Sequence, residues 1–539
     1  MNPRLLARRT TGRRVPLRAV ACAAALLALP VAPLVATSVA HAAAPAPAGA
    51  FTQKLTKTPG TNQVTFSFTP APDNKDSRFV DVHYVVKGAP EGTQSFRMTR
   101  GDDGTWSRQA SLSGPDFEYW YTYADAKGAA VDTGRFDKDG NPQNTPPPPD
   151  GAGAFPLKVQ TPPGKDLYLT VVGQVTPGHY SFLRPDGTTI PVYHPADGDQ
   201  DTEHKDGKTY PKMSFKVSGG ANGISLPPSM EGGRIFVSDQ PLLMDAARNA
   251  SGGYDDSGYV QPDANNPQDP NRDTRYDFFE FTYRHDKIAF GGNTTQVDGF
   301  SLPMTAELKQ DSSGFDKKVG IAGKSASEVI AAYKDSPDVG QAFKSLVNSA
   351  GTHISAPRSS PQFRDGGASA HYFDATIDKA WEKWASGFTL ADGDTTYRGA
   401  TKTGADGRPQ LAFTRFEKKD GKDVEAGKGA VNKPSTADVA ACAGALASGS
   451  DTEKFVEARL CAAFNRGVAL NDPATWSDAS RYYAKGTGVP FNDYAAFFHS
   501  ISLDGLAYAF PYDDVHEKSS VMILPNADTP TSLTLTLGG

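Results

Sequence analysis

Two acidic residues lie close together in a strand-rich segment of this chain, YDFFEFTYRHDKIAFGGNTTQVDGFSLP (276–303). Period-two alternation places Glu280 and Thr282 on one face of the first strand and leaves the opposite face aromatic. Asp298 follows a polar run a few residues later. Two carboxyl groups on neighbouring strands can act as the acid and the base that cleave a glycosidic bond. The spacing alone also allows both carboxylates simply to face solvent.

The separation of the two carboxyl groups depends on strand register. A diagonal pair on neighbouring strands would place the Cβ atoms about 7–8 Å apart. That separation falls within the ~6.5–9.5 Å that an inverting glycosidase uses to admit a water, whereas a retaining one needs ~5–5.5 Å. A directly opposite pair would approach the shorter range, and the sequence does not choose the register.

Strand patterns divide the first part of the chain into two β regions. Short strand-like runs separated by glycines predict a β-sandwich module over residues 51–138. Residues 139–153 contain four consecutive prolines and predict a semi-rigid linker. Strand-like runs return over 154–315, where the long polar loop 251–275 leads directly into the strand of Glu280 and is expected to line a groove.

Helical periodicity appears after residue 315. Segments 325–349, 371–386, 437–446 and 452–466 carry good helix formers. Further strands are expected at 410–416 and at the C-terminus. Residues 316–539 are therefore predicted to form a mixed α/β domain that includes the last strand.

Composition limits the classes of partner. The chain has 539 residues with a formal net charge of −6, which argues against nucleic acid or an anionic membrane as partner. The motifs of nucleotide-binding loops and zinc proteases do not occur in the sequence. We expect no cofactor and no metal site, and a monomer.

The N-terminus predicts export. Residues 1–42 combine a basic start, an apolar stretch and the small-residue site Ala40-His41-Ala42, so we expect signal-peptide cleavage after Ala42. Arg13-Arg14 resembles a twin-arginine signal, although Pro16 is atypical, and the export route stays open. The mature protein would be secreted, with no membrane anchor.

Two cysteines remain after signal removal. Cys442 and Cys461 lie in alanine-rich helical stretches separated by a Ser-Gly-Ser turn. An oxidising compartment favours a disulfide between them. Metal ligation is the alternative, but the additional Cys or His ligands of a zinc site are not nearby in the sequence.

The module at 51–138 contains a candidate sugar platform. In FEYWYTY (117–123), alternation places Trp120 on the face opposite a tyrosine-rich one, and indole rings pack well on sugars. The alternative has Trp120 in the core and the tyrosines outward. The words DVHYVVKG, FRMTRGDDGTW and FEYWYTY resemble family 56 carbohydrate-binding modules, which accompany β-1,3-glucanases.

The second resemblance covers the rest of the chain. The words FFEFTY, TQVDGFSLP, GRIFVSDQPL (233–242) and AYAFPYDDV (507–515) are similar to those of family 64 glycoside hydrolases, the laminaripentaose-producing β-1,3-glucanases. The resemblance implies a multi-domain, mainly β chain. In it, a thaumatin-like β-barrel packs on a mixed α/β domain, with a wide groove between them for a β-1,3-glucan.

The resemblance also implies roles for particular residues. Glu280 matches the general acid and Asp298 the general base of an inverting, endo-acting hydrolase. Thr282 matches a residue that contacts substrate, and Asp513 and Asp514 match a carboxylate word near the groove. Which of these two aspartates reaches sugar is left open, and a capping or loop role is equally compatible with either.

The sequence departs from the family pattern at one turn, and one alternative function is also considered. Arg284-His285-Asp286-Lys287 replaces the aromatic or asparagine-bearing turn that the family usually has between acid and base, so the resemblance does not assign the neighbouring sugar contacts. The competing hypothesis is a non-catalytic, thaumatin-like glucan-binding protein, which would bind polysaccharide without releasing reducing sugars.

Overall fold

The computed structural model describes residues 51–72, 77, 79–86, 93–101, 103–124, 130–133, 135–142, 153–185, 187–195, 202–218, 222–249, 251–285, 287–516, 522–524 and 526–538. The expected signal peptide (1–42) and most of the expected linker (139–153) lie outside these residues. Among the described residues, no helix has the length and apolar character needed to cross a bilayer.

The N-terminal module consists of two antiparallel sheets. One sheet has the order β1 (Phe51–Lys57), β2 (Gln63–Pro70), β6 (Trp106–Ser111), β5 (Thr99–Arg100). The other has the order β4 (Thr93–Arg97), β3 (Val80–Val86), β7 (Phe117–Ala124), β8 (Ala130–Asp132), with β9 (Phe136–Asp137) also paired to β7. Tyr119, Tyr121 and Tyr123 of β7 point into the shared core, as the alternation predicts.

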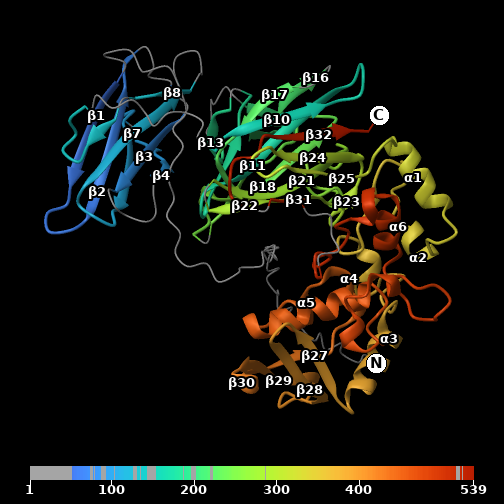
Figure 1. Ribbon diagram of the computed structural model, residues 1–539. Coiled ribbons are helices and arrows are strands. Elements are labelled where there is room, and N and C mark those ends of the chain that lie inside the picture. The colour runs from blue at the N-terminus through green and yellow to red at the C-terminus, as the bar shows by residue number, and fades with distance from the viewer. Residues whose placement is uncertain are drawn as a thin grey trace, which may run out of the picture. The chain divides into compact units, whose positions relative to one another are not determined.

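The second β region also has two sheets (Figure 1). The five-stranded sheet has the order β17 (Asn222–Leu226), β10 (Phe155–Gln160), β32 (Ser532–Leu537), β24 (Met304–Gln310), β25 (Phe315–Gly320). The eight-stranded sheet has the order β13 (Thr189–Pro191), β12 (His179–Leu183), β11 (Asp166–Thr176), β18 (Ser229–Ser238), β21 (Tyr276–Arg284), β22 (Ile288–Thr294), β31 (Met522–Ile523), and β16 (Phe215–Ser218) pairs with β11. Three two-stranded pairs accompany them: β14 (Thr202–Lys205) with β15 (Lys208–Pro211), β19 (Ala246–Arg248) with β20 (Tyr254–Tyr259), and β23 (Gly299–Phe300) with β26 (Ile354–Ser355).

One core joins the two sheets of this region. Alternate residues of β10, β24 and β32 meet the aromatic face of β21, so Leu157 and Leu535 share a cluster with Phe279 and Phe281. Burial of that aromatic face fixes the register of β21, because a one-residue slip would turn the phenylalanines toward the other side. Glu280 is thereby held on the side away from this core.

The C-terminal strand corrects the expected domain boundary. β32 pairs in parallel with β10 and antiparallel with β24, and β31 pairs with β22. Leu533, Leu535 and Leu537 alternate into the same core, so the last strands belong to the β region and not to the α/β domain. β25 likewise continues past residue 315.

The helical part lies between β25 and β31 in sequence. Its helices are α1 (Ala326–Asp335), α2 (Gln341–Lys344), α3 (Asp374–Trp384), α4 (Thr436–Ala441), α5 (Asp451–Asn465) and α6 (Asp493–Ile501). Short 3₁₀ turns are η2 (Pro361–Phe363), η3 (Gly444–Leu446), η4 (Pro473–Thr475), η5 (Ala479–Arg481) and η6 (Leu503–Gly505). A four-stranded antiparallel sheet runs in the order β27 (Phe388–Asp392), β28 (Thr395–Thr403), β29 (Pro409–Lys419), β30 (Lys422–Asn432).

Local chemistry explains where these helices begin and end. Ser325 and Glu328 form a capping box that begins α1. The predicted helix 325–349 is divided into α1 and α2, because the residue before Pro337 is disfavoured in helical geometry. The other three predicted helical segments are present: α3 and α4 are shorter than predicted, and α5 has the predicted length with its bounds shifted by one residue.

Candidate active site

Glu280 lies on the central strand β21 of the eight-stranded sheet. The strand register places it directly across from Arg234 of β18 on one side and Asn293 of β22 on the other. Its side chain is 24% exposed. This partly exposed carboxyl group is therefore positioned by three strands at once.

Arg234 forms an ion pair with Glu280. Its Nε and Nη2 atoms lie 2.9 and 2.8 Å from Oε1 of Glu280. The guanidinium carbon lies 5.1 Å from the centre of the Phe278 ring. Burial opposes the charge of Arg234, but the neighbouring Tyr259 and the carboxylates of Glu280 and Asp298 outweigh it and raise its pKa.

Asp298 lies in the segment between β22 and β23. Its Oδ2 accepts a hydrogen bond of 3.0 Å from Nε2 of Gln261, and its Oδ1 lies 3.5 Å from Nη1 of Arg358. Because β22 ends at Thr294, Asp298 has no cross-strand partner on β21, so neither of the two strand registers that the sequence left open is formed. Side chains, not strand register, connect the two carboxyl groups.

Gln261 completes that connection. Its Oε1 accepts a short hydrogen bond from Nη1 of Arg234, while its Nε2 donates to Asp298. The hydroxyl of Tyr259 also lies 3.4 Å from Nη1 of Arg234. The chain Glu280–Arg234–Gln261–Asp298 is therefore continuous. The segment 251–275, expected to be a loop throughout, forms strand β20 over Tyr254–Tyr259 and brings Gln261 to these side chains.

The segment that carries Asp298 is fixed at both ends. Asp277 of β21 accepts hydrogen bonds from the backbone N–H groups of Ser301, at 2.6 Å, and of Leu302. Burial raises the pKa of Asp277 to about 8, although those two N–H donors oppose the shift. At the other end, the N–H of Gln296 donates to the carbonyl of Tyr508 at 2.8 Å.

Tyr508 brings the helical part to the site. Its backbone forms a bridge with Thr295. Burial raises the pKa of the Tyr508 hydroxyl, and the negative charges of Asp514 and Glu280 reinforce the shift. The Tyr508 hydroxyl therefore lies close enough to interact electrostatically with Asp514 and Glu280.

Thr282 lies two residues beyond Glu280 on the same face. Its Oγ1 accepts a hydrogen bond of 3.0 Å from the backbone N–H of Gly232. The hydroxyl hydrogen remains a donor, so a half-buried Thr282 can still bind an oxygen atom of a ligand.

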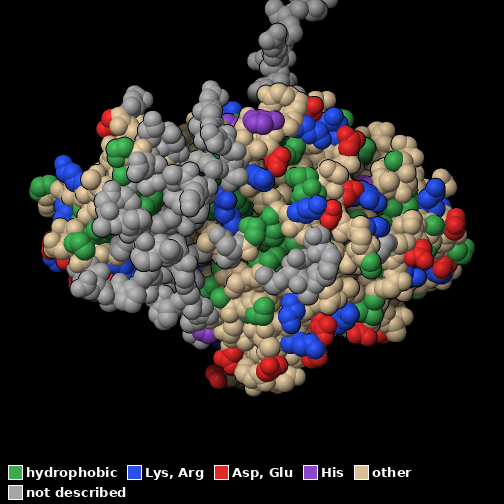
Figure 2. Space-filling model, turned by 90° about the horizontal axis from the view of Figure 1, so that it is seen from above, with side chains coloured by type: hydrophobic (Ala, Val, Ile, Leu, Met, Phe, Trp, Pro, Cys, Tyr) green, Lys and Arg blue, Asp and Glu red, His purple; other side chains and the backbone are tan. Residues whose placement is uncertain are grey.

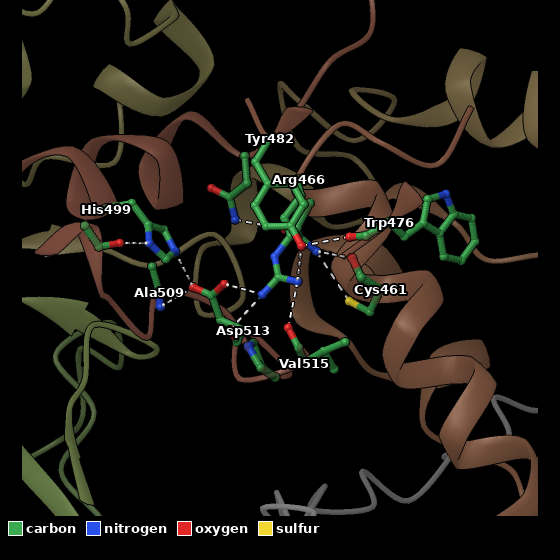
Figure 3. Close-up of polar contacts among 12 residues, drawn as sticks. Cys461, Arg466, Trp476, Tyr482, His499, Ala509, Asp513 and Val515 are labelled. Atoms are coloured by element: carbon green, nitrogen blue, oxygen red, sulfur yellow. Dashed lines mark hydrogen bonds and ion pairs between the residues drawn. The ribbon is translucent and has the colours of Figure 1, made fainter. Parts of the chain in front are cut away.

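Asp513 and Asp514 have different surroundings. The Asp513 side chain is 0% exposed and contacts Arg466 at 3.2 Å and His499 at 2.9 Å (Figure 3). It also accepts from the N–H of Ala509 at 3.0 Å, so it stabilises the loop and is not available to sugar. Asp514 is half-buried, burial raises its pKa, and its Oδ1 is buried without a hydrogen-bond partner among the described residues.

Trp120 does not provide an open platform. It lies on the face opposite the tyrosines, as expected, but it is only 2% exposed. His83 stacks on its ring with centroids 5.1 Å apart, and the Arg135 guanidinium carbon lies 4.4 Å from the ring centre. The prediction of an exposed stacking residue is wrong because polar neighbours cover the indole.

The cysteine pair forms the expected disulfide. Cys442, which follows α4, and Cys461 of α5 are bonded, with Cα atoms 5.7 Å apart. Sγ of Cys442 lies 2.9 Å from the carbonyl of Pro511, directly before the loop that carries Asp513 and Asp514. The bond therefore supports the loop that contributes to the site.

Three residues of the site were not expected from the sequence. Arg234 falls within a quoted word, and its polar character in a strand of apolar neighbours is a usable signal. Gln261 and Arg358 come from loops distant in sequence, and no local pattern distinguishes them from solvated residues. The groups of acidic, histidine and cysteine side chains among the described residues include no cluster suited to a metal ion.

The arrangement defines a class of protein. Two partly exposed carboxyl groups linked by an arginine and an amide can donate and accept protons on a bound substrate. The family model described as "Beta-1,3-glucanase", glycoside hydrolase family 64, matches residues 154–537, and the chain belongs to this family. The model of carbohydrate-binding module family 56 matches residues 53–133.

Individual relatives agree with this assignment. The chain is 28% identical over 272 residues to a glucan endo-1,3-beta-glucosidase of Cellulosimicrobium cellulans, covering 50% of this chain and 46% of the relative. It therefore spans about half the length of the curated relatives it matches. An enzyme of the same name from Arthrobacter sp. (strain YCWD3) is also 28% identical, over 281 residues, 50% of this chain and 46% of the relative.

Solved structures show the same fold. A beta-1,3-glucanase domain from Clostridium beijerinckii is 29% identical, with a TM-score of 0.60, covering 73% of this chain and 100% of that one. A laminaripentaose-producing beta-1,3-glucanase from Paenibacillus barengoltzii, complexed with laminarihexaose, is 27% identical with a TM-score of 0.52 and covers 91% of this chain and 100% of its own.

Proposed function

We propose that this protein is a secreted, inverting endo-β-1,3-glucanase that cleaves laminarin and curdlan to short oligosaccharides, chiefly laminaripentaose. The observation that carries the proposal is the Glu280–Arg234–Gln261–Asp298 chain, which brings both expected carboxyl groups into one partly exposed site. Family membership and the similarity to named glucanases support the substrate class.

In this mechanism Glu280 is the general acid and Asp298 the general base. Glu280 gives its proton to the glycosidic oxygen as the bond to the anomeric carbon breaks, and the leaving sugar departs with a hydroxyl group. Asp298 removes a proton from a water whose oxygen bonds to the anomeric carbon on the opposite face. The configuration at that carbon is inverted.

Other residues would contact the substrate. Thr282 lies on the face of Glu280, and its hydroxyl can donate to a sugar oxygen. Asp514 is the better candidate of the acidic pair, because its buried Oδ1 has no hydrogen-bond partner among the described residues whereas Asp513 is occupied by Arg466 and His499. Contact between Arg358 of the helical part and Asp298 supports a glucan chain that passes where the two parts meet.

The proposal also covers the N-terminal module, the architecture of the catalytic region and the surface charge. Residues 51–138 would bind β-1,3-glucan as a separate module joined by the linker 139–153, with a site other than an open Trp120. The two-sheet region from 154 would correspond to the thaumatin-like barrel of the family, and the mature protein would act as a monomer without cofactor. On the face seen in Figure 2, Lys and Arg side chains are interspersed with Asp and Glu, which suits a neutral polysaccharide.

Digestion of curdlan and laminarin tests the proposal. We expect the wild type to release oligosaccharides dominated by the pentasaccharide, with the α-anomer first in NMR spectra recorded during the first minutes. The Glu280→Gln variant should bind laminarin but release no reducing sugar. Binding without hydrolysis by the wild type would instead favour the non-catalytic glucan-binding protein, and hydrolysis by the variant would refute the role of Glu280.

A further inference from the structure

The two carboxyl groups do not contact each other directly but are joined by the side chains of Arg234 and Gln261. We propose that Arg234 and Gln261 are positioning residues that decide which oxygen of each carboxyl group takes part in the reaction. This inference rests on the proposed function, since it assigns the parts of that same site.

Arg234 acts on the acid. Its Nε and Nη2 donors both contact the same oxygen, Oε1 of Glu280. An oxygen that accepts two N–H groups is a poor place for an additional proton, so the acidic hydrogen must sit on Oε2. The guanidinium thus directs the proton of Glu280 to the carboxyl oxygen that it does not contact.

Gln261 acts on the base. Because its Oε1 accepts from Arg234, its amide cannot flip without placing two donors face to face, and its Nε2 must point toward Asp298. The hydrogen bond of Nε2 falls on Oδ2 of Asp298. Oδ1, whose contact with Arg358 is longer at 3.5 Å, is then the oxygen that can accept a proton from water.

Neighbouring residues hold the Arg234 side chain in the orientation that this role requires. Arg234 lies directly across the strand ladder from Glu280, its side chain is 17% exposed, and it lies over the Phe278 ring. The Tyr259 hydroxyl flanks the same Nη1 atom that contacts Gln261. All three guanidinium nitrogens therefore have a hydrogen-bond or ion-pair partner. A lysine ammonium group cannot reproduce this planar arrangement of donors.

The first test uses Arg234→Lys and two substrates. On laminarin we expect kcat to fall about 100-fold while KM stays within about threefold, as for misplacement of a reacting group. A 2,4-dinitrophenyl laminari-oligosaccharide has a leaving group that needs little proton donation, so its loss should be at least about tenfold smaller. Equal losses on both substrates, or a loss below about threefold on laminarin, would overturn the role assigned to Arg234.

The second test uses Gln261→Ala and Gln261→Glu. Because Gln261 acts on the base, we expect kcat for both substrates to fall by a similar factor, and Gln261→Glu to be the more severe since it places a carboxylate beside Asp298. In the Arg234→Lys/Gln261→Ala double variant the losses should be non-additive, as for two members of one unit. A wild-type kcat in Gln261→Ala, or additive losses of kcat in the double variant, would show that Arg234 and Gln261 do not act as one unit.

Controls separate this inference from folding and from the proposed function. Arg275→Lys is a matched control, because Arg275 directly precedes β21 and pairs with Asp239 at 2.8 Å, and it should leave kcat unchanged. Thermal unfolding of each variant identifies loss of fold, and in that event Arg234→Gln is tested in its place. If Glu280→Gln is inactive while Arg234→Lys has wild-type kcat, the function stands and this inference fails; an inactive wild type would refute the function itself.

Discussion

Two arginine–carboxylate pairs in this molecule consist of similar residues but differ in their exposure to solvent. At the sheet, Arg234 and Glu280 are 17% and 24% exposed, with Tyr259 beside them. In the helical part, Arg466 and Asp513 are 1% and 0% exposed, with Tyr482 beside them. Residue type alone does not distinguish them.

The difference lies in how the carboxylate oxygens are used. Asp513 accepts from Arg466 on Oδ1 and from both His499 and Ala509 on Oδ2, so both of its oxygens are occupied. The Arg234 contacts of Glu280 both fall on Oε1. A buried carboxylate with every oxygen bonded stabilises a fold, whereas a partly exposed one held at a single oxygen can exchange a proton with a ligand.

The largest expected effect is on catalysis at the exposed site. Asp298→Asn removes the proposed base, so kcat on laminarin should fall by about 10²–10⁴-fold while the free energy of unfolding changes by less than about 1 kcal/mol. Steady-state kinetics and urea denaturation measure the two quantities. Asp239→Asn, which alters an ion-paired aspartate of the same β region, is the control and should retain activity. Retained activity in Asp298→Asn would contradict the comparison.

The second prediction concerns the buried pair, for which we expect a loss of stability where the first prediction expects a loss of activity. Arg466→Met leaves Asp513 buried without its guanidinium partner and should lower the free energy of unfolding by about 3–5 kcal/mol. Urea denaturation at neutral pH measures the loss. The control Arg481→Met breaks an exposed pair with Asp478 and should cost less than about 1 kcal/mol. Similar losses in the two variants would show that burial does not distinguish the pairs.

The third prediction concerns the disulfide behind the buried pair. Replacing both Cys442 and Cys461 by serine should lower the free energy of unfolding by about 3 kcal/mol, because the unfolded chain regains loop entropy. Chemical denaturation of the wild type with and without dithiothreitol should give the same difference. A stability that is insensitive to reduction would count against the bond as a support of the Asp513 loop.

The smallest expected effect is a pH dependence of His499. Burial opposes its charge, but the carboxylate of Asp513 and the carbonyl of Gly505 outweigh burial and raise its pKa. Since the folded pKa lies above the unfolded value of about 6.5, the stabilisation is complete below that pH and is lost as pH rises through the folded pKa. The stability difference between wild type and His499→Gln should therefore shrink with rising pH over this window. A difference that grows with pH would contradict the sign.

Much of the fold could be predicted from the sequence. The alternation of aromatic residues in β21 and of tyrosines in β7 predicts which faces are buried, and both patterns are confirmed. The cysteine pair and the helical segments follow from local composition. These predictions succeed because neighbours in sequence determine them.

The site was less predictable because its geometry depends on side chains from distant loops. Gln261 and Arg358 reach Asp298 through tertiary contacts that no local period reveals. The burial of Asp513 and of Trp120 is hidden from the sequence for the same reason, because it is set by Arg466, His83 and Arg135. The roles of Glu280, Asp298 and Thr282 remain predictions.

The position of β32 has a consequence for biosynthesis. This strand fills the space between β10 and β24, yet it is synthesised after both of them and after the helical part. Until then β10 and β24 present unpaired edges across an incomplete sheet while the whole helical part is made. The nascent chain must avoid pairing those edges with other molecules, and loss of the six-residue strand β32 should leave the protein prone to aggregation rather than simply less active.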